Sequence, residues 1–367
     1  MKKIITVMTV ILIFITTTFA NELKFDEKKL DSLDYYLMNL NDQRIILDKN
    51  SDKKIYPASM TKIMTAIIVI ENTTNFDKKI IVTEGDLEFG YDASVVGLQS
   101  DEMITVEDAL HGMLLASGAD AAHAAAVHMA GSEEEFVKIM NQKAQYLGLE
   151  NTHYTNCSGI HDEDHYTTLK DLSILFQYCM KNEKFKTIME TETYTINPFT
   201  DNPHVLNSYH KLLFEKQGFN SSLIKGAKTG YTPEAGDCMI SIAEYEGIQF
   251  LFASAEGPAL NNEYKVNVGD AINVYKSFLD QYKTVTVETD SNSDIQVHVP
   301  KNYDETKMQS NQSDDQIIIT YDEQELTKKP ILKETTAFEN IWLYLGFLSA
   351  IICVAPFVYV WKKGEKQ

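Results

Sequence analysis

The order of its predicted strands and helices limits this chain to few folds. Two apolar runs in residues 35–48, separated by a polar turn, predict a β-hairpin near the N-terminus. Three more strands are predicted much later, at residues 224–229, 238–243 and 248–253, again joined by short polar turns. Because the predicted helices fall between these two sets of strands, we expect an α+β fold in which the first and last strands share one antiparallel sheet.

Helical periodicity fills the segment between the strands. Thr105 and Asp108 form the pattern of a capping box before an apolar-periodic run, and Asp120 is a second candidate N-cap. Apolar residues at helical spacing predict an amphipathic helix over residues 136–147, and a further helix begins at Thr168. The content of apolar residues, 44%, is sufficient for a substantial core.

Both ends of the chain are hydrophobic. Residues 1–20 combine two early lysines with an apolar run and small residues at the cleavage positions, which is typical of a secretory signal peptide; an uncleaved anchor is the alternative. Residues 341–361 carry no charge and are followed by Lys362 and Lys363, which predicts a single transmembrane helix with its C-terminal side in the cytoplasm. We therefore expect a protein of the cell membrane, with the part between the two hydrophobic ends on the extracytoplasmic side.

The sequence pattern changes within the part between these ends, which divides into two predicted domains. Residues 21–283 would form the larger one. Short alternating runs separated by Ser, Asn and Asp clusters predict a small all-β domain over residues 284–330. Residues 331–340 would then be a stalk, and residues 362–367 a cytoplasmic tail.

Charge and cysteine usage exclude several functions. The net charge of −20 at pH 7 disfavours binding to nucleic acid or to anionic lipid headgroups. The four cysteines show no metal-ligand spacing and no disulfide framework, although one bridge remains open. His161 and His165 are spaced as in a zinc-protease motif, but Asp162 stands where that motif has Glu, so we predict no metal; no phosphate-binding glycine loop indicates a cofactor either.

Ser59 and Lys62 are the candidate catalytic pair. They form an S-x-x-K sequence at the start of a helix whose residues 63–70 are too densely apolar for the surface. One helical turn separates the two side chains, so a direct hydrogen bond is possible. Burial would lower the pKa of Lys62 and allow it to act as a base for the Ser59 hydroxyl. Alone, the motif also fits an N-capping serine followed by a surface lysine.

Two further motifs follow in the order that serine acyl-transfer enzymes use. Ser117 and Gly118 lie between two predicted helices, in a loop able to reach a cleft. Lys228-Thr229-Gly230 comes at the end of a predicted strand, where Lys and Thr can bind a carboxylate and Gly permits close approach of a substrate. Together with S-x-x-K, these elements indicate an enzyme.

From about Tyr35 to Lys283, the chain resembles the low-molecular-mass penicillin-binding proteins, the serine-type D-alanyl-D-alanine carboxypeptidases of peptidase family S11. The resemblance rests on PASMTKIMT at residues 57–65 and GAKTGYT at residues 226–232, with further matching segments within 148–172. It implies the penicillin-binding, β-lactamase-like transpeptidase fold, an antiparallel sheet with helices. It also implies a substrate, a peptidoglycan stem peptide ending in D-Ala-D-Ala, and β-lactam antibiotics as inhibitors.

The resemblance also implies roles for individual residues. Ser59 would attack the penultimate D-Ala carbonyl, Lys62 would take its proton, and Ser117 would relay a proton to the departing D-alanine. Substrate binding falls to Lys228, Thr229, Gly230 and Tyr231: the first two would hold the terminal carboxylate, and the backbone N–H groups of Ser59 and Tyr231 would form the oxyanion hole.

One departure from the family pattern concerns the second motif. The family has Ser-x-Asn, whereas this chain has Ser117-Gly118-Ala119, so an amide that would contact the substrate and Lys62 is missing. Such a loss costs about 1–3 kcal/mol in the transition state. Arg44 is the only arginine in the chain, so carboxylate binding must rely on lysine.

Two alternatives belong to neighbouring functions. A class A β-lactamase would need a Glu-x-x-Leu-Asn segment between Ser117 and Lys228, and the chain has none. A non-hydrolytic β-lactam sensor or wall-binding module remains the second hypothesis, motivated by Ala119 and by the predicted membrane tether.

Overall fold

The computed structural model describes residues 25–330, apart from residues 42, 90–92, 198–199, 201–202, 260–264, 288–294, 302, 313–315 and 322–323. It divides into two compact units: one runs to Val285 and includes His298–Tyr303, and the other comprises Thr286–Val297 and the residues from Asp304 on. The predicted signal peptide, stalk, transmembrane helix and tail lie outside the described residues. Within the described part of the chain, none of the helices has the length and apolar character needed to cross a membrane.

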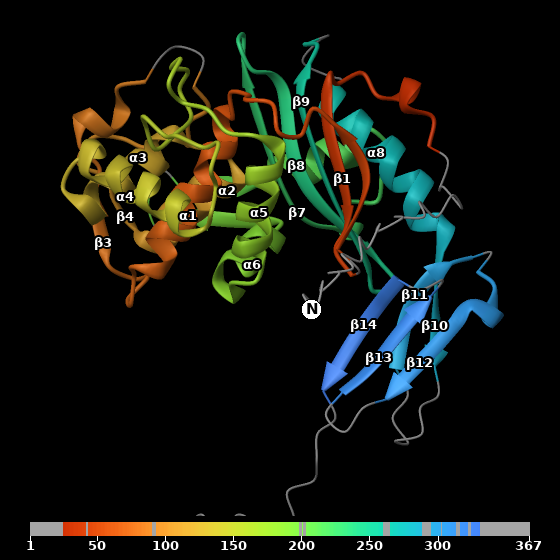
Figure 1. The fold of residues 1–367 in the computed structure, drawn as a ribbon. Helices are drawn as coiled ribbons and strands as arrows, with labels where there is room; N and C mark the ends of the chain where they lie inside the picture. Colours follow the sequence, from red (N-terminus) through yellow and green to blue (C-terminus); the bar gives the residue numbers. More distant parts are fainter. Residues whose placement is uncertain are drawn as a thin grey trace, which may run out of the picture. The chain divides into compact units, whose positions relative to one another are not determined.

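A five-stranded antiparallel sheet forms the centre of the first unit (Figure 1). The N-terminal hairpin of β1 (Asp34–Asn39) and β2 (Arg44–Lys49) pairs through β1 with β9 (Ile248–Gly257). Next to β9 lie β8 (Gly236–Tyr245) and then β7 (Ile224–Thr232), which forms one edge of the sheet. The prediction that the first and last strands share a sheet is confirmed.

Helices cover both faces of this sheet (Figure 1). On one face lie α1 (Lys62–Glu71), α2 (Val106–Leu115), α3 (Ala119–Ala130), α4 (Glu133–Tyr146), α5 (Leu169–Met180) and α6 (Glu183–Glu190). On the other face lie α7 (Tyr209–Lys216) and α8 (Val266–Phe278). Each face has its own cluster of buried apolar side chains, so the central strand β9 and its neighbour β8 are buried on both sides.

Predicted capping residues begin two of the helices. The side chain of Thr105 accepts a hydrogen bond from the Asp108 backbone N–H at 2.9 Å, and Asp108 accepts one from the Thr105 N–H at 2.7 Å, so this capping box is confirmed. Thr168 caps α5 in the same way, accepting from the N–H of Asp171 at 3.0 Å.

Asp120 has a different role from the one that its sequence position predicts. α3 begins at Ala119, after Gly118, so the expectation that Asp120 is the N-cap is wrong. Its carboxylate instead accepts hydrogen bonds from three consecutive backbone N–H groups, those of Val96, Gly97 and Leu98, at 2.9–3.1 Å. Asp120 therefore ties the extended segment around residue 96 to the start of α3.

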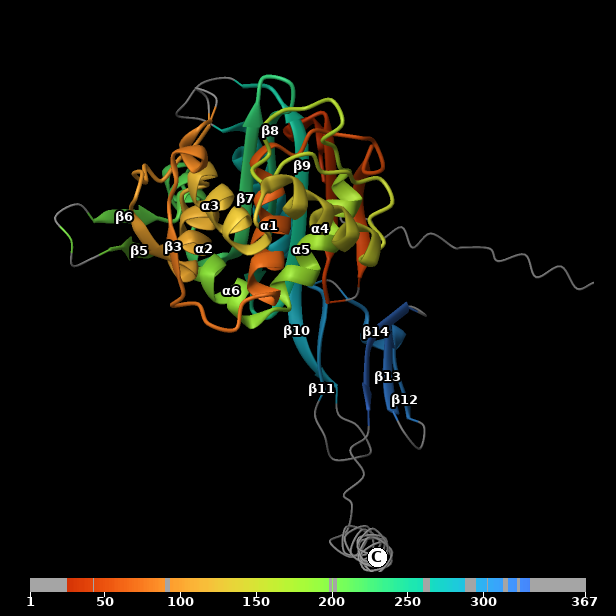
Figure 2. The same ribbon diagram turned by 90° about the vertical axis from the view of Figure 1, so that its left-hand side faces the viewer.

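Two short ribbons flank the helices, β3 (Lys79–Ile81) with β4 (Met103–Thr105) and β5 (Thr193–Ile196) with β6 (His204–Asn207) (Figure 2). Towards the C-terminus, β10 (Tyr282–Val287) pairs with β11 (Ile295–Pro300), while β12 (Met308–Gln312), β13 (Gln316–Tyr321) and β14 (Gln324–Pro330) form a three-stranded antiparallel sheet. The alternating runs that the sequence shows within residues 284–330 are thus strands.

Candidate active site

Ser59 lies on a tight turn that two glycines enclose. A 3-10 turn, Ala58–Thr61, leads directly into α1, and Ala58 adopts a left-handed backbone conformation with φ of 47°. A Cβ atom on Gly159 would lie 1.8 Å from the carbonyl oxygen of Ala58, and one on Gly230 would lie 2.8 Å from that of Pro57. These contacts are possible only for glycine, and they fix the turn that presents Ser59.

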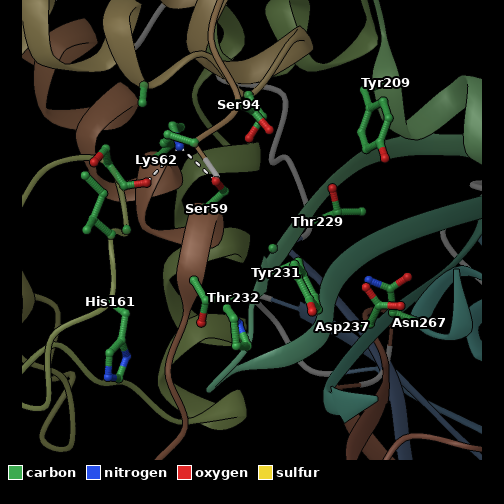
Figure 3. Close-up of a pocket in the computed structure, with 18 of the residues that line it drawn as sticks. Ser59, Lys62, Ser94, His161, Tyr209, Thr229, Tyr231, Thr232, Asp237 and Asn267 are labelled. Carbon is green, nitrogen blue, oxygen red and sulfur yellow. Dashed lines mark hydrogen bonds between the residues drawn. The ribbon is translucent and has the colours of Figure 1, made fainter. Parts of the chain in front are cut away.

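Lys62 is held against the hydroxyl of Ser59. Its Nζ atom lies 2.8 Å from Ser59 Oγ and 2.7 Å from the backbone carbonyl oxygen of Ser158 (Figure 3). The side chain is 2% exposed, and this burial lowers the pKa of Lys62 to about 8, because the surroundings disfavour the charged form. About a tenth of Lys62 would therefore be neutral at pH 7, and this form can accept the serine proton.

Ser117 and Lys228 form a second buried pair. Lys228 Nζ donates to Ser117 Oγ at 2.7 Å and to the carbonyl oxygen of Thr229 at 3.0 Å. Burial and the nearby charge of Lys62 hold the pKa of Lys228 well below its usual range. Ser117, whose φ is 60°, thus has a proton donor behind it and the substrate cavity in front.

A cavity of about 450 Å³ lies in front of Ser59. Of the residues predicted from the sequence, Ser59, Lys62, Ser117, Thr229, Gly230 and Tyr231 line it, and Lys228 does not. The strand residues come from the open edge of β7, and Ser94, Ala119 and residues 158–161 line it as well. Lys228 therefore contacts the cavity through the Ser117 hydroxyl.

Several lining residues are absent from the sequence predictions. Tyr209 of α7, Asp237 of β8 and Asn267 of α8 are among them (Figure 3). Leu213 of α7 and Lys265, directly before α8, line the cavity as well. They lie far apart in the sequence and belong to no motif, so only the fold brings them together. Among these residues, only Asp237 stands out in the sequence, as a carboxylate directly before the apolar run of a predicted strand.

Ala119 offers the cavity no polar side-chain group, in keeping with the missing amide of the second motif. Its backbone N–H donates to the carbonyl oxygen of Ser94 at 2.8 Å, which holds the neighbouring wall in place. The carbonyl oxygen of Ser158 supplies Lys62 with a second hydrogen-bond partner besides Ser59.

The two histidines considered for a metal site have separate environments. His165 is buried, its Nε2 lies 2.8 Å from Thr61 Oγ1, and burial lowers its pKa to about 4. His161 lines the cavity, with Nδ1 4.0 Å from Glu234 Oε2. His165 is therefore a neutral group that supports the turn carrying Ser59.

The site combines a serine and a buried lysine at the start of a helix, a second Ser–Lys pair beside them, and an open strand edge along the cavity. These features define a serine acyl-transfer site of the penicillin-binding class. A sequence model of peptidase S11, D-alanyl-D-alanine carboxypeptidase, matches residues 21–253, which is more than half of the chain. The chain belongs to this family.

Individual relatives agree with this assignment. D-alanyl-D-alanine carboxypeptidase DacF of Bacillus subtilis is 32% identical over 253 residues, which cover 66% of this chain and 63% of that protein. The crystal structure of the Streptomyces K15 DD-transpeptidase is 26% identical with a TM-score of 0.61, and the match covers 68% of this chain and 98% of that one. Penicillin binding protein 6B from Escherichia coli, 20% identical, has a TM-score of 0.66 over 83% of this chain and 96% of its own.

These structures confirm the expected α+β penicillin-binding-like fold. The chain spans just under two thirds of the length of DacF, and about half (52%) of the length of D-alanyl-D-alanine carboxypeptidase DacA from Haemophilus influenzae, which is 31% identical.

Proposed function

We propose that this protein is a D-alanyl-D-alanine carboxypeptidase that removes the terminal D-alanine from peptidoglycan stem peptides through an acyl-enzyme on Ser59. The observation that carries the proposal is the 2.8 Å contact between Ser59 Oγ and Lys62 Nζ, made by a lysine whose pKa burial lowers to about 8. Membership of the peptidase S11 family supports the choice of substrate.

Acylation follows from the positions of the side chains. Ser59 Oγ attacks the penultimate carbonyl carbon while Lys62 takes its proton, and the backbone N–H groups of Ser59 and Tyr231 stabilise the oxyanion. The absence of a side chain at Gly230 supports this, because β7 there passes close enough that a Cβ would lie 3.2 Å from the Ser59 nitrogen. Ser117 then passes a proton to the leaving amine as the C–N bond breaks, and water hydrolyses the ester.

The terminal carboxylate requires a cation that faces the cavity. Lys228 lies behind Ser117 and its pKa is held well below its usual range, so we assign it to proton transfer through the Ser117 hydroxyl. Lys265 and Lys62 are the described lysines that line the cavity, and Lys62 is engaged with Ser59. We therefore propose that Thr229 and Lys265 hold the carboxylate while the peptide extends along the open edge of β7, as in β-strand addition.

The same arrangement supports acylation by β-lactams, which would form an ester with Ser59 and inhibit the enzyme. The apolar, charge-free segment at residues 341–361 and the signal-peptide pattern at residues 1–20 support a location on the outer face of the cell membrane. We further propose that residues 284–330 form a small all-β domain between the catalytic part and this anchor, which the strand content of the segment supports.

The test is release of D-alanine from a peptide ending in D-Ala-D-Ala by the purified protein. Ser59→Ala should abolish both turnover and labelling by a fluorescent penicillin, while its thermal unfolding stays close to that of the wild type. Labelling of the wild type without D-alanine release would favour the non-hydrolytic sensor. Labelling that persists in Ser59→Ala would place the nucleophile elsewhere.

A further inference from the structure

Asp237 is a buried carboxylate at the cavity wall that the proposed mechanism does not use. It lies on β8 directly opposite Tyr231 of β7, and its side chain is 2% exposed (Figure 3). Its Oδ2 atom has no hydrogen-bond partner in the described part of the chain. An unpaired oxygen on a buried carboxylate is energetically costly. Because this carboxylate lies at the wall of the cavity, a role in ligand binding would explain the cost.

Lys265 is the cation beside this carboxylate. Its Nζ atom lies 3.6 Å from Asp237 Oδ1 and 5.5 Å from the centre of the Tyr231 ring, so it reaches across the cavity wall. Asn267, the other polar neighbour, uses its side-chain N–H₂ group for the carbonyl oxygen of Cys238, at 2.7 Å. A ligand entering here therefore meets an ion pair instead of an isolated ammonium group.

We propose that Asp237 is a specificity-determining residue that sets, through Lys265, how strongly the cavity binds the terminal carboxylate of a substrate or a β-lactam. Charges a few ångströms apart interact strongly where water is excluded, so an ionised Asp237 offsets part of the attraction between Lys265 and a third, anionic group. This inference rests on the proposed function, because it assigns the carboxylate end of the ligand to the wall that holds Thr229 and Lys265.

The experiment is a double-mutant cycle on the full chain with fluorescent penicillin as the probe, whose carboxylate would occupy the same wall. The second-order acylation constant is measured for the wild type, Asp237→Asn, Lys265→Gln and the double variant. We expect Asp237→Asn to raise it about tenfold and Lys265→Gln to lower it about tenfold, the size typical of close charge pairs in partly buried sites. In the Lys265→Gln background, Asp237→Asn should change it by less than about twofold.

D-alanine release gives a second readout. Asp237→Asn should lower KM for a D-Ala-D-Ala peptide and leave kcat nearly unchanged, because the carboxylate is bound in the ground state and in the transition state alike. Glu256→Gln is the matched control: it removes one carboxylate from the neighbouring strand β9, where Glu256 pairs with Lys53 outside the cavity. Its acylation constant should equal that of the wild type.

Two results would overturn the inference: an unchanged or lower acylation constant in folded Asp237→Asn, or an equal rise in both backgrounds. If Asp237→Asn unfolds, Asp237→Ser repeats the test with a smaller side chain. Lys265→Gln stands on its own, and unaltered acylation by that variant also refutes the proposal. Wild-type protein that is acylated but releases no D-alanine would refute the carboxypeptidase function. The double-mutant cycle would still test the role of Asp237, because it measures acylation by the penicillin alone.

Discussion

The Nζ atom of Lys62 lies 2.7 Å from the backbone carbonyl oxygen of Ser158. This contact orients the lysine toward Ser59 in a chain whose second motif has Ala119 where its family has asparagine. Ala119→Asn should leave folding intact, because Ala119 lines the cavity, and raise turnover by about two- to tenfold through one added polar contact. D-alanine release measures the effect, and an unchanged rate would show that the Ser158 carbonyl already suffices.

The pH dependence of acylation should follow the neutral form of Lys62. Because burial lowers the pKa of Lys62 to about 8, the acylation constant should rise about tenfold per pH unit below that value and level off above it. Stopped-flow measurements with a β-lactam across this range test the prediction. A rate that is flat between pH 6 and about 8 would mean that another group takes the serine proton.

Lys62→Met should abolish acylation and yet stabilise the protein at neutral pH. The folded-state pKa of about 8 lies below the ordinary value of 10.5, so the folded state binds the proton less well than the unfolded chain. That penalty is fully present below pH 8 and disappears as the pH rises toward 10.5. We expect a gain of about 1–3 kcal/mol in the free energy of unfolding at pH 7, by denaturant titration, and little gain near pH 10.

Gly159→Ala should displace the turn that carries Ser59. The new Cβ would lie 1.8 Å from the Ala58 carbonyl oxygen, so we expect acylation to fall about 100-fold or more. Gly131→Ala is the matched control, since Gly131 has the same φ of 88° but no atom within 4 Å of the added Cβ. Equal losses in the two variants would show that backbone strain, and not the contact with Ala58, is responsible.

Asp120→Asn should affect both stability and the pH profile. The amide cannot serve three backbone donors as well as the carboxylate does, so we expect about 1–3 kcal/mol of destabilisation. The charge of Asp120 also raises the pKa of Lys62, so its removal should shift the acid limb of the acylation profile to lower pH. A shift to higher pH would contradict this electrostatic role.

The sequence predicts the strands of the sheet and the contact between Ser59 and Lys62 well, because both depend on local patterns. Strand alternation, the capping box of Thr105 and the spacing of Ser59 and Lys62 are local, and the structure agrees with each. Asp120 fails as an N-cap because a distant segment near residue 96 competes for its carboxylate. Nothing in the sequence indicates that the backbone N–H groups near residue 96 need a hydrogen-bond acceptor from the segment around Asp120.

The wall that we propose to bind the carboxylate could not be predicted from the sequence for a similar reason. Asp237, Lys265 and Tyr209 lie on three elements that meet only once β7, β8, α7 and α8 have packed. A second limit concerns accessibility: the Lys-Thr-Gly motif identifies Lys228, whose ammonium group donates to the Ser117 hydroxyl and does not itself line the cavity. Strand alternation alone does not show which lysine meets the ligand.

The open edge of β7 has a consequence for the integrity of the protein as well as for binding. A strand edge that is open to an extended peptide, as we propose for β7, also exposes unpaired backbone groups, which are the usual starting point of aggregation through edge-to-edge pairing. Tyr231 on this strand is 49% exposed, whereas its neighbour Gly230 packs closely against Pro57. We expect a bound β-lactam to protect the purified protein from aggregation, because it would occupy the edge of β7 with which a strand of another copy could otherwise pair.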